Sequence, residues 1–141
     1  MFTKIPERFR SRVLLGLQGT GSGTGAYLAP TPGVMGLTIR VITTMGNAAD
    51  LKLDLKYADD TSGTNAAAYP IDVPLFVNGE RKEDGKSYTI EDNTGDFIVD
   101  FSVDPATIPE GKTIGLSYDN SNAGNLLTAI LIEDVAYRPA S

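Results

Sequence analysis

The residues of this sequence that could do chemistry are clustered acids, because the chain contains no histidine and no cysteine. Asp59 and Asp60 are adjacent, and Glu91, Asp92 and Asp96 form a second group. Two carboxyl groups of different pKa could share acid and base roles, as in a hydrolase that holds Glu91 and Asp96 across a cleft. Both groups fall in polar turns with nothing nearby to desolvate them. We therefore expect solvated turn acids and no catalytic residue.

Metal binding has few candidate ligands, since the imidazole and thiolate groups that bind zinc are missing. Asp119, Asn120 and Asn122, or Asp59 with Asp60, could offer oxygen atoms to calcium. The terminal bidentate glutamate of a calcium-binding loop is absent from both segments. We expect no metal ligand and no cofactor.

Two glycine-containing segments match phosphate-binding loops only in part. The run at residues 19–25, GTGSGTG, has neither dinucleotide-type spacing nor a following helix. The segment 106–113, ATIPEGKT, ends like a nucleotide-binding loop, but Ala106 replaces its first glycine and Pro109 lies inside it. We expect a flexible or partner-ordered loop in the first segment and a turn into a strand in the second.

Alternating apolar and polar residues dominate the rest of the sequence, as in strands with one buried face. Predicted strands cover residues 12–18, 34–43, 51–57, 71–77, 87–90, 97–103, 113–118 and 126–137. Turn residues such as Asn78-Gly79 separate them, and no helix of ordinary length fits between. We predict one all-β domain, an antiparallel β-sandwich. We favour a jelly-roll-like form because the cysteine and tryptophan of immunoglobulin domains are missing.

Two segments of the predicted sandwich, residues 13–141, depart from this alternation. The loop at residues 18–33 holds five of the fifteen glycines and is costly to order alone. The last strand is apolar on both faces between Leu126 and Ile132. Such a strand is either central in its sheet or covered by another chain.

An N-terminal arm, residues 1–12, is both apolar and basic. Four basic residues and one acidic residue give it a net charge of +3, which leaves −9 for the rest of the chain. Burying one apolar arm side chain could contribute about 1.5–3 kcal/mol, whereas an exposed charge contributes at most about 1 kcal/mol. The arm either binds a partner or folds back on its own sandwich. Its apolar and basic residues are Phe2, Lys4, Ile5, Arg8, Phe9, Arg10 and Arg12.

The acidic body would repel nucleic acid and anionic lipid. No apolar stretch reaches the length of about 20 residues that a membrane helix needs. We therefore expect neither nucleic acid nor membrane as a partner. A carbohydrate-binding face would use exposed aromatic rings, for which Tyr27, Tyr69, Tyr88 and Tyr118 are the candidates. Tyrosines in sandwiches more often place their rings at the edge of the core.

The arm, the glycine-rich loop, the jelly-roll-like body and the apolar last strand together resemble small capsid decoration (cement) proteins of tailed bacteriophages. That resemblance implies a non-catalytic structural protein, made in the host cytoplasm, that binds the outside of the capsid and cross-bridges its capsomers. It implies the major capsid protein as partner, and a homo-oligomer in which a trimer is favoured over a dimer. The alternative is a carbohydrate-binding or receptor-binding sandwich module of a virion or extracellular protein.

The resemblance also implies which residues would make these contacts. The arm and the loop would contact the capsid, and the last strand would contact a neighbouring protomer. The implied loop residues are Gly19, Gly21, Gly23, Gly25 and Tyr27, and the implied protomer contacts are Leu127, Ile130 and Ile132.

Overall fold

The computed structural model describes residues 9–91 and 94–135, which form eleven strands in two antiparallel sheets. The six-stranded sheet has the order β1 (Phe9–Gly19), β11 (Asn125–Val135), β3 (Val34–Met45), β9 (Gly95–Val103), β6 (Val73–Val77) and β7 (Glu80–Gly85). The five-stranded sheet has the order β2 (Thr24–Leu28), β10 (Thr113–Tyr118), β4 (Leu51–Ala58) and β5 (Ala67–Ala68), and β8 (Ser87–Ile90) also pairs with β4. A short 3₁₀ turn, η1 (Pro105–Thr107), precedes β10.

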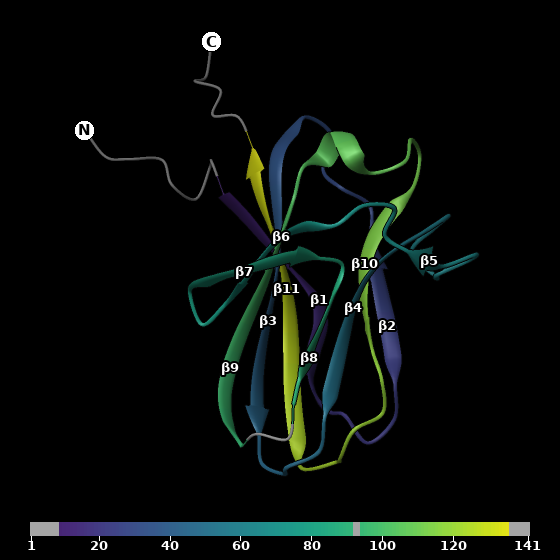
Figure 1. Cartoon of the computed structure of the whole chain (residues 1–141). Helices are drawn as coiled ribbons and strands as arrows, with labels where there is room; N and C mark the ends of the chain where they lie inside the picture. The colour runs from purple at the N-terminus through teal and green to yellow at the C-terminus, as the bar shows by residue number, and fades with distance from the viewer. Residues whose placement is uncertain (1–8, 92–93, 136–141) are drawn as a thin grey trace.

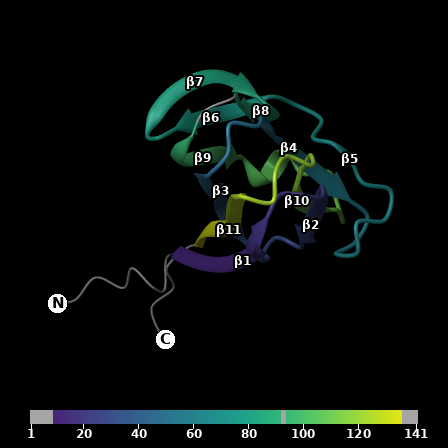
Figure 2. The same cartoon turned by 90° about the horizontal axis from the view of Figure 1, so that it is seen from below.

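The two sheets pack face to face as a sandwich. Figure 1 shows β3, β9 and β11 in one layer and β2, β4 and β10 in the other. Seen from below, the six-stranded sheet curves from β1 at one edge to the β6–β7 hairpin at the other (Figure 2). The predicted all-β sandwich is therefore confirmed.

The order of the strands is that of a jelly roll. With β5, β6 and β7 set aside, the first strand pairs with the last, the second with the second-last, and so on inwards. These nested antiparallel pairs are β1 with β11, β2 with β10, β3 with β9 and β4 with β8. Rolling up this long hairpin adds the pairs between β11 and β3 and between β10 and β4. The hairpin of β6 and β7 extends one sheet beyond the roll.

The core lies between the sheets and is built by alternate residues of each strand. On the six-stranded sheet its centre is formed by Ile39, Val41, Val99, Phe101, Leu127, Ala129 and Leu131, all fully buried. On the other sheet it is formed by Leu51, Leu53, Leu55, Ile114 and Leu116. Every buried side-chain nitrogen and oxygen atom of the described residues has a hydrogen-bond partner.

The predicted strands are present with small shifts of their ends, and residues 87–90 and 113–118 are β8 and β10 as predicted. Residues 106–113 form a turn leading into β10, also as predicted. The strand predicted for residues 71–77 begins only at Val73, so Ile71 lies before β6 and is exposed. The strands β2, β5 and β7 were not predicted. Within the described ranges, no helix is long and apolar enough to cross a membrane.

The predicted arm and its boundary need a correction. Strand β1 begins at Phe9, so residues 9–12 belong to the sandwich and pair with Leu131 to Asp134 of β11. The rest of the predicted arm, residues 1–8, lies outside the described residues.

Gly115 leaves no room for a side chain where β10 pairs with β2 in the five-stranded sheet. A Cβ atom built there would lie 2.2 Å from the carbonyl oxygen of Ala26 and 2.3 Å from the ring of Tyr27. We expect Gly115→Ala to lower the free energy of unfolding by about 1–3 kcal/mol through overpacking. Gly16→Ala is the matched control, because a Cβ atom at Gly16 has no neighbour within 4 Å. Urea unfolding of both variants measures the difference in stability. Equal unfolding midpoints would contradict the explanation that a side chain at position 115 overpacks the sheet.

Candidate protein-binding surface

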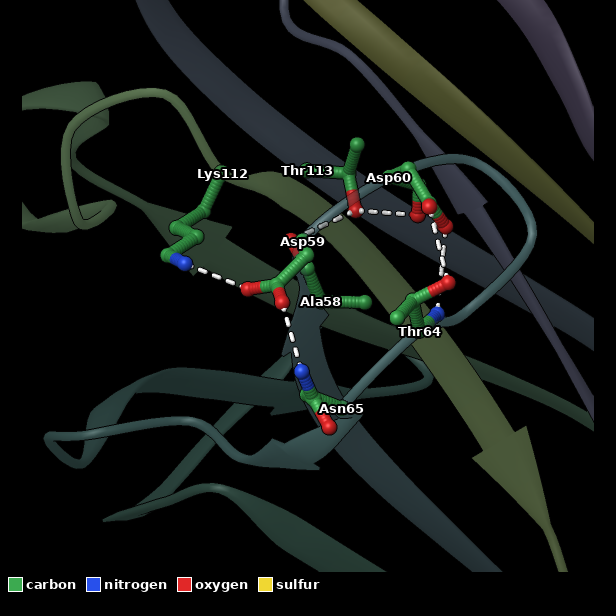
Figure 3. Close-up of polar contacts among 7 residues, drawn as sticks. All are labelled: Ala58, Asp59, Asp60, Thr64, Asn65, Lys112 and Thr113. Carbon is green, nitrogen blue, oxygen red and sulfur yellow. Dashed lines mark hydrogen bonds and ion pairs between the residues drawn. The ribbon is translucent and has the colours of Figure 1, made fainter.

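The first acidic candidates, Asp59 and Asp60, close the loop between β4 and β5 (Figure 3). Lys112 Nζ and Asn65 Nδ2 both donate to the Asp59 carboxylate, the latter over 2.7 Å. Thr64 donates to Asp60 from its hydroxyl over 2.7 Å and from its backbone N–H over 3.1 Å. Hydrogen bonds from Lys112 hold the pKa of Asp59 below its usual value, and those from Thr64 do the same for Asp60. Both carboxyl groups are therefore ionised turn acids that order a loop.

This explanation predicts separate responses of the two carboxyl groups. Lys112→Met removes the main donor to Asp59, so we expect the pKa of Asp59 to rise toward its usual value. The pKa of Asp60 should stay low, because its main donor is Thr64. Since both pKa values are depressed in the folded state, their contribution to stability is present near neutral pH and is lost as pH falls through the folded pKa. NMR titration of the side-chain carboxyl groups measures both pKa values. An unchanged pKa of Asp59 in Lys112→Met would contradict the role of Lys112 as its main donor.

The other candidate acids are surface residues. Glu91 is exposed just after β8, and Asp96 is exposed on β9 opposite Thr44. Asp92 lies outside the described residues. Asn122 holds its own turn, because its Oδ1 atom accepts a hydrogen bond from Gly124 N over 2.8 Å. Among the residues that the structure describes, no group of three or more acidic, histidine or cysteine side chains could hold a metal ion.

The glycine-rich loop is ordered by its own chain, which corrects the prediction of a flexible or partner-ordered loop. Thr20 is fully buried, and its hydroxyl bonds to the carbonyl oxygens of Asn122 and Asn125. Cβ atoms built at Gly19 and Gly23 would lie 2.9 Å and 2.8 Å from backbone oxygens of residues 123 and 118. Cβ atoms built at Gly21 and Gly25 would also be within 3.3 Å of that region. These glycines are needed for close packing, so their presence gives no support to a capsid contact.

Tyr27, Tyr69 and Tyr118 are packed within the domain. The ring of Tyr27 lies against Gly63 and Gly115, and partial burial raises the pKa of its hydroxyl. Tyr69 is fully buried, with its hydroxyl 2.6 Å from that of Thr107. Tyr118 is also buried and donates to Gln18 over 2.7 Å. Tyr69 and Tyr118 therefore have no exposed ring face for a sugar.

Arg12 was assigned to the capsid-binding arm, but it forms a partly buried ion pair with Glu133. Its Nε and Nη2 atoms donate to the two carboxylate oxygens of Glu133 over 3.1 Å and 3.3 Å. Thr31 donates to the same carboxylate from its backbone N–H over 2.6 Å and from its hydroxyl over 2.7 Å. Glu133 is fully buried. The network joins β1, the β2–β3 connection and β11, which leaves Arg12 unavailable to an external partner.

The remaining arm residues divide between the edge of the sandwich and the undescribed segment. Phe9 and Arg10 are exposed at the start of β1, which is an edge strand of its sheet. Phe2, Lys4, Ile5 and Arg8 lie outside the described residues.

The predicted protomer contacts lie on opposite faces of β11. Leu127 is fully buried in the core, so it cannot contact a neighbour, and its assignment is corrected. Ile130 and Ile132 are partly exposed on the outer face of the sheet. The strand itself is central, between β1 and β3, which explains why both of its faces are apolar.

An apolar stripe crosses the outer face of the six-stranded sheet. Val13 pairs with Ile130 and Ile42 pairs with Ile98, so each pair lies side by side on the outer face. Ile130 and Ile42 are diagonal neighbours across β11 and β3, which brings the two pairs within reach of each other. Val13, Ile42 and Ile98 are 67%, 36% and 37% exposed. We call Val13, Ile42, Ile98 and Ile130 the apolar stripe.

The charges beside the stripe neutralise each other. Arg40 lies between Ile130 and Asp100 in one cross-strand row. Its Nε and Nη2 atoms donate to the two Asp100 oxygens over 2.8 Å and 3.1 Å. The centre of this face therefore combines branched apolar side chains with the ion pair of Arg40 and Asp100, whose charges neutralise each other.

The outer face of the five-stranded sheet is different in character. The corresponding positions of β4 are Lys52, Asp54 and Lys56, with an ion pair between Lys52 and Asp54 at 3.8 Å. Their cross-strand neighbours include Ser117, Ser87 and Thr89. One face of the sandwich therefore has the polar surface expected next to water, and the other has an uncovered apolar stripe.

The stripe was not predicted from the sequence, although a signal for it exists. Ile42, Ile98 and Ile130 occupy polar positions of the alternating pattern, each next to an inward apolar residue. These residues lie side by side only because of the way the strands pair, and the sequence pattern does not predict that pairing. The sequence matches no protein-family model, and no curated protein is significantly similar to it. The functional proposal below therefore depends on the fold and its surface.

Proposed function

We propose that this chain is a non-catalytic structural protein that binds the outside of a viral capsid and cross-bridges its capsomers. The observation that supports this role is the apolar surface of edge strand β1. Phe9, Val13 and Leu17 are 44%, 67% and 74% exposed there. An edge strand with large apolar side chains is a liability in a free protein and a suitable surface for a protein partner.

The capsid contact in this proposal is made by the first residues of β1 together with the segment that precedes them. Phe9 and Ile132 border a hollow of about 210 Å³ on the outer face, which could receive an apolar side chain of the partner. Arg10 is exposed at the same end of β1, on the opposite face of the strand from Phe9, and adds a positive charge. Each chain then has one weak contact, and several contacts in one oligomer raise the avidity for the shell.

Co-sedimentation with capsid shells tests the proposal. The shells are assembled from a major capsid protein encoded beside the gene for this chain, and the proposal expects such a gene there. We expect the chain to pellet with these shells and a Phe9→Ser, Arg10→Glu variant to bind at least about tenfold more weakly. Ile71→Ser is the matched control, because Ile71 is equally exposed but lies in the loop before β6. No binding, or equal binding by both variants, would contradict the proposal.

The carbohydrate-binding alternative is separated by a second experiment. A glycan array should give no hits with or without calcium if the chain is a capsid-binding protein. A specific glycan hit, reproduced in solution, would favour the alternative and count against the capsid role.

A further inference from the structure

The outer face of the six-stranded sheet has properties expected of an interface between two copies of this chain. We propose that it binds a second copy of this chain, sheet against sheet, with the apolar stripe at the centre of the interface. This goes beyond the capsid role, because such a dimer needs no capsid.

The stripe is the part of the surface where charge opposes a second copy least. The chain has a net charge of −6, so two copies repel each other over most orientations. At the stripe the charges of Arg40 and Asp100 are already paired, over 2.8 Å and 3.1 Å. A neutral, apolar centre matches an identical surface, whereas a nucleic acid would need a basic one.

The size of the face is close to that of a standard interface. Four strands spaced about 4.8 Å apart and about nine residues long cover roughly 600 Å². Including β6 and β7, which have five and six residues, raises this to roughly 770 Å². A standard interface buries about 800 Å² on each partner, so the outer face comes close to that size.

The shape of the stripe also suits the packing of sheet on sheet. Its four residues are all β-branched, and such side chains stand upright from a strand and interdigitate between sheets about 10 Å apart. On one side of the stripe, Ser11, Thr38 and Ser102 share a cross-strand row with Ile132 and give it neutral polar groups. An apolar centre with a polar surround is the usual anatomy of a protein interface.

Sedimentation velocity of the full-length chain over a wide concentration range tests the inference. We expect a reversible change from a monomer of 15.0 kDa to a species of twice that mass. Ile42→Lys and Ile98→Lys place like charges on both sides of the interface and should weaken the dimer by about 100-fold or more. Ile71→Lys is the matched control and should dimerise like the wild type, because Ile71 lies outside this face. Circular dichroism and urea unfolding confirm that each variant keeps its fold.

Three outcomes would overturn the inference. The wild type could remain a monomer at every concentration, the stripe variants could dimerise as well as the control, or deletion of residues 1–8 alone could abolish the dimer. The last result would assign the contact to the N-terminal segment. Shell binding by a strictly monomeric chain would overturn this inference and leave only the capsid contact of β1 in place. A chain that forms a stripe-dependent dimer but does not bind shells would support this inference and contradict the capsid role.

Discussion

Replacing Glu133 with alanine should lower the free energy of unfolding by about 3–5 kcal/mol, the largest effect we expect of any single substitution in the chain. The Glu133 side chain is fully buried and accepts four hydrogen bonds, two from Arg12 and two from Thr31. Without the carboxylate, the Thr31 N–H loses its partner, and the Arg12 guanidinium keeps only its hydrogen bond to the Ala29 carbonyl oxygen. A partly buried charge without a counter-charge is strongly destabilising.

Two further variants separate the contribution of the Arg12–Glu133 pair to stability from that of an ordinary surface charge. The exposed pair of Lys82 and Glu80, 3.7 Å apart, is the surface control, and Glu80→Ala should change stability by less than about 1 kcal/mol. A double variant, Arg12→Met with Glu133→Met, should recover much of the loss, because an apolar pair leaves no buried charge. Urea unfolding of all variants gives the values. A Glu133→Ala variant as stable as Glu80→Ala would contradict the role of this network.

Leu127→Ala should lower the free energy of unfolding by about 2–5 kcal/mol, as expected for a leucine removed from a packed core. Leu127 is fully buried on the inner face of the central strand β11. Ile130→Thr, three positions along the same strand, should cost no more than about 1 kcal/mol in the monomer, because Ile130 lies on the outer face.

Both variants should be measured at a concentration where the chain is monomeric, so that only folding is compared. Sedimentation velocity then separates their effects on association, which Ile130→Thr should weaken. The reverse pattern, a stable Leu127→Ala and an unfolded Ile130→Thr, would show that β11 has the opposite orientation.

Most of the fold could be predicted from local patterns. The alternation of residues 51–57 and 97–103 gave the inner and outer faces of β4 and β9 directly. The hairpin turn at Asn78-Gly79 was also evident, and both residues adopt positive φ angles of 51° and 81°. The strand that follows it, β7, has no apolar residues at all, because it forms an edge that projects beyond the roll.

Strand β2 was missed for a different reason. Its glycines suggested an unstructured loop, but Gly25 is required by the close approach of Ser117 and Leu116 on the neighbouring strand. A local pattern cannot show which glycines serve flexibility and which serve close packing. That distinction depends on a partner about 90 residues away in the chain.

The candidate contacts were partly predictable. Leu127 and Ile130 are an odd number of positions apart, so a strand must place them on opposite faces, and the sequence alone could have separated them. The pairing of Arg12 with Glu133 could not be predicted in this way, because it depends on the register between the first and last strands. The same is true of the stripe, whose members come from four strands.

The most direct measurement is hydroxyl-radical footprinting of the chain, free at low concentration and assembled on capsid shells, with side-chain labelling read by mass spectrometry. We expect labelling of Phe9, Val13, Ile42 and Ile98 to fall several-fold in the assembly, while Ile71 keeps its labelling. Unchanged labelling of the four residues, or protection confined to the opposite sheet, would contradict the claim that β1 and the outer face of its sheet are the surfaces by which this protein acts.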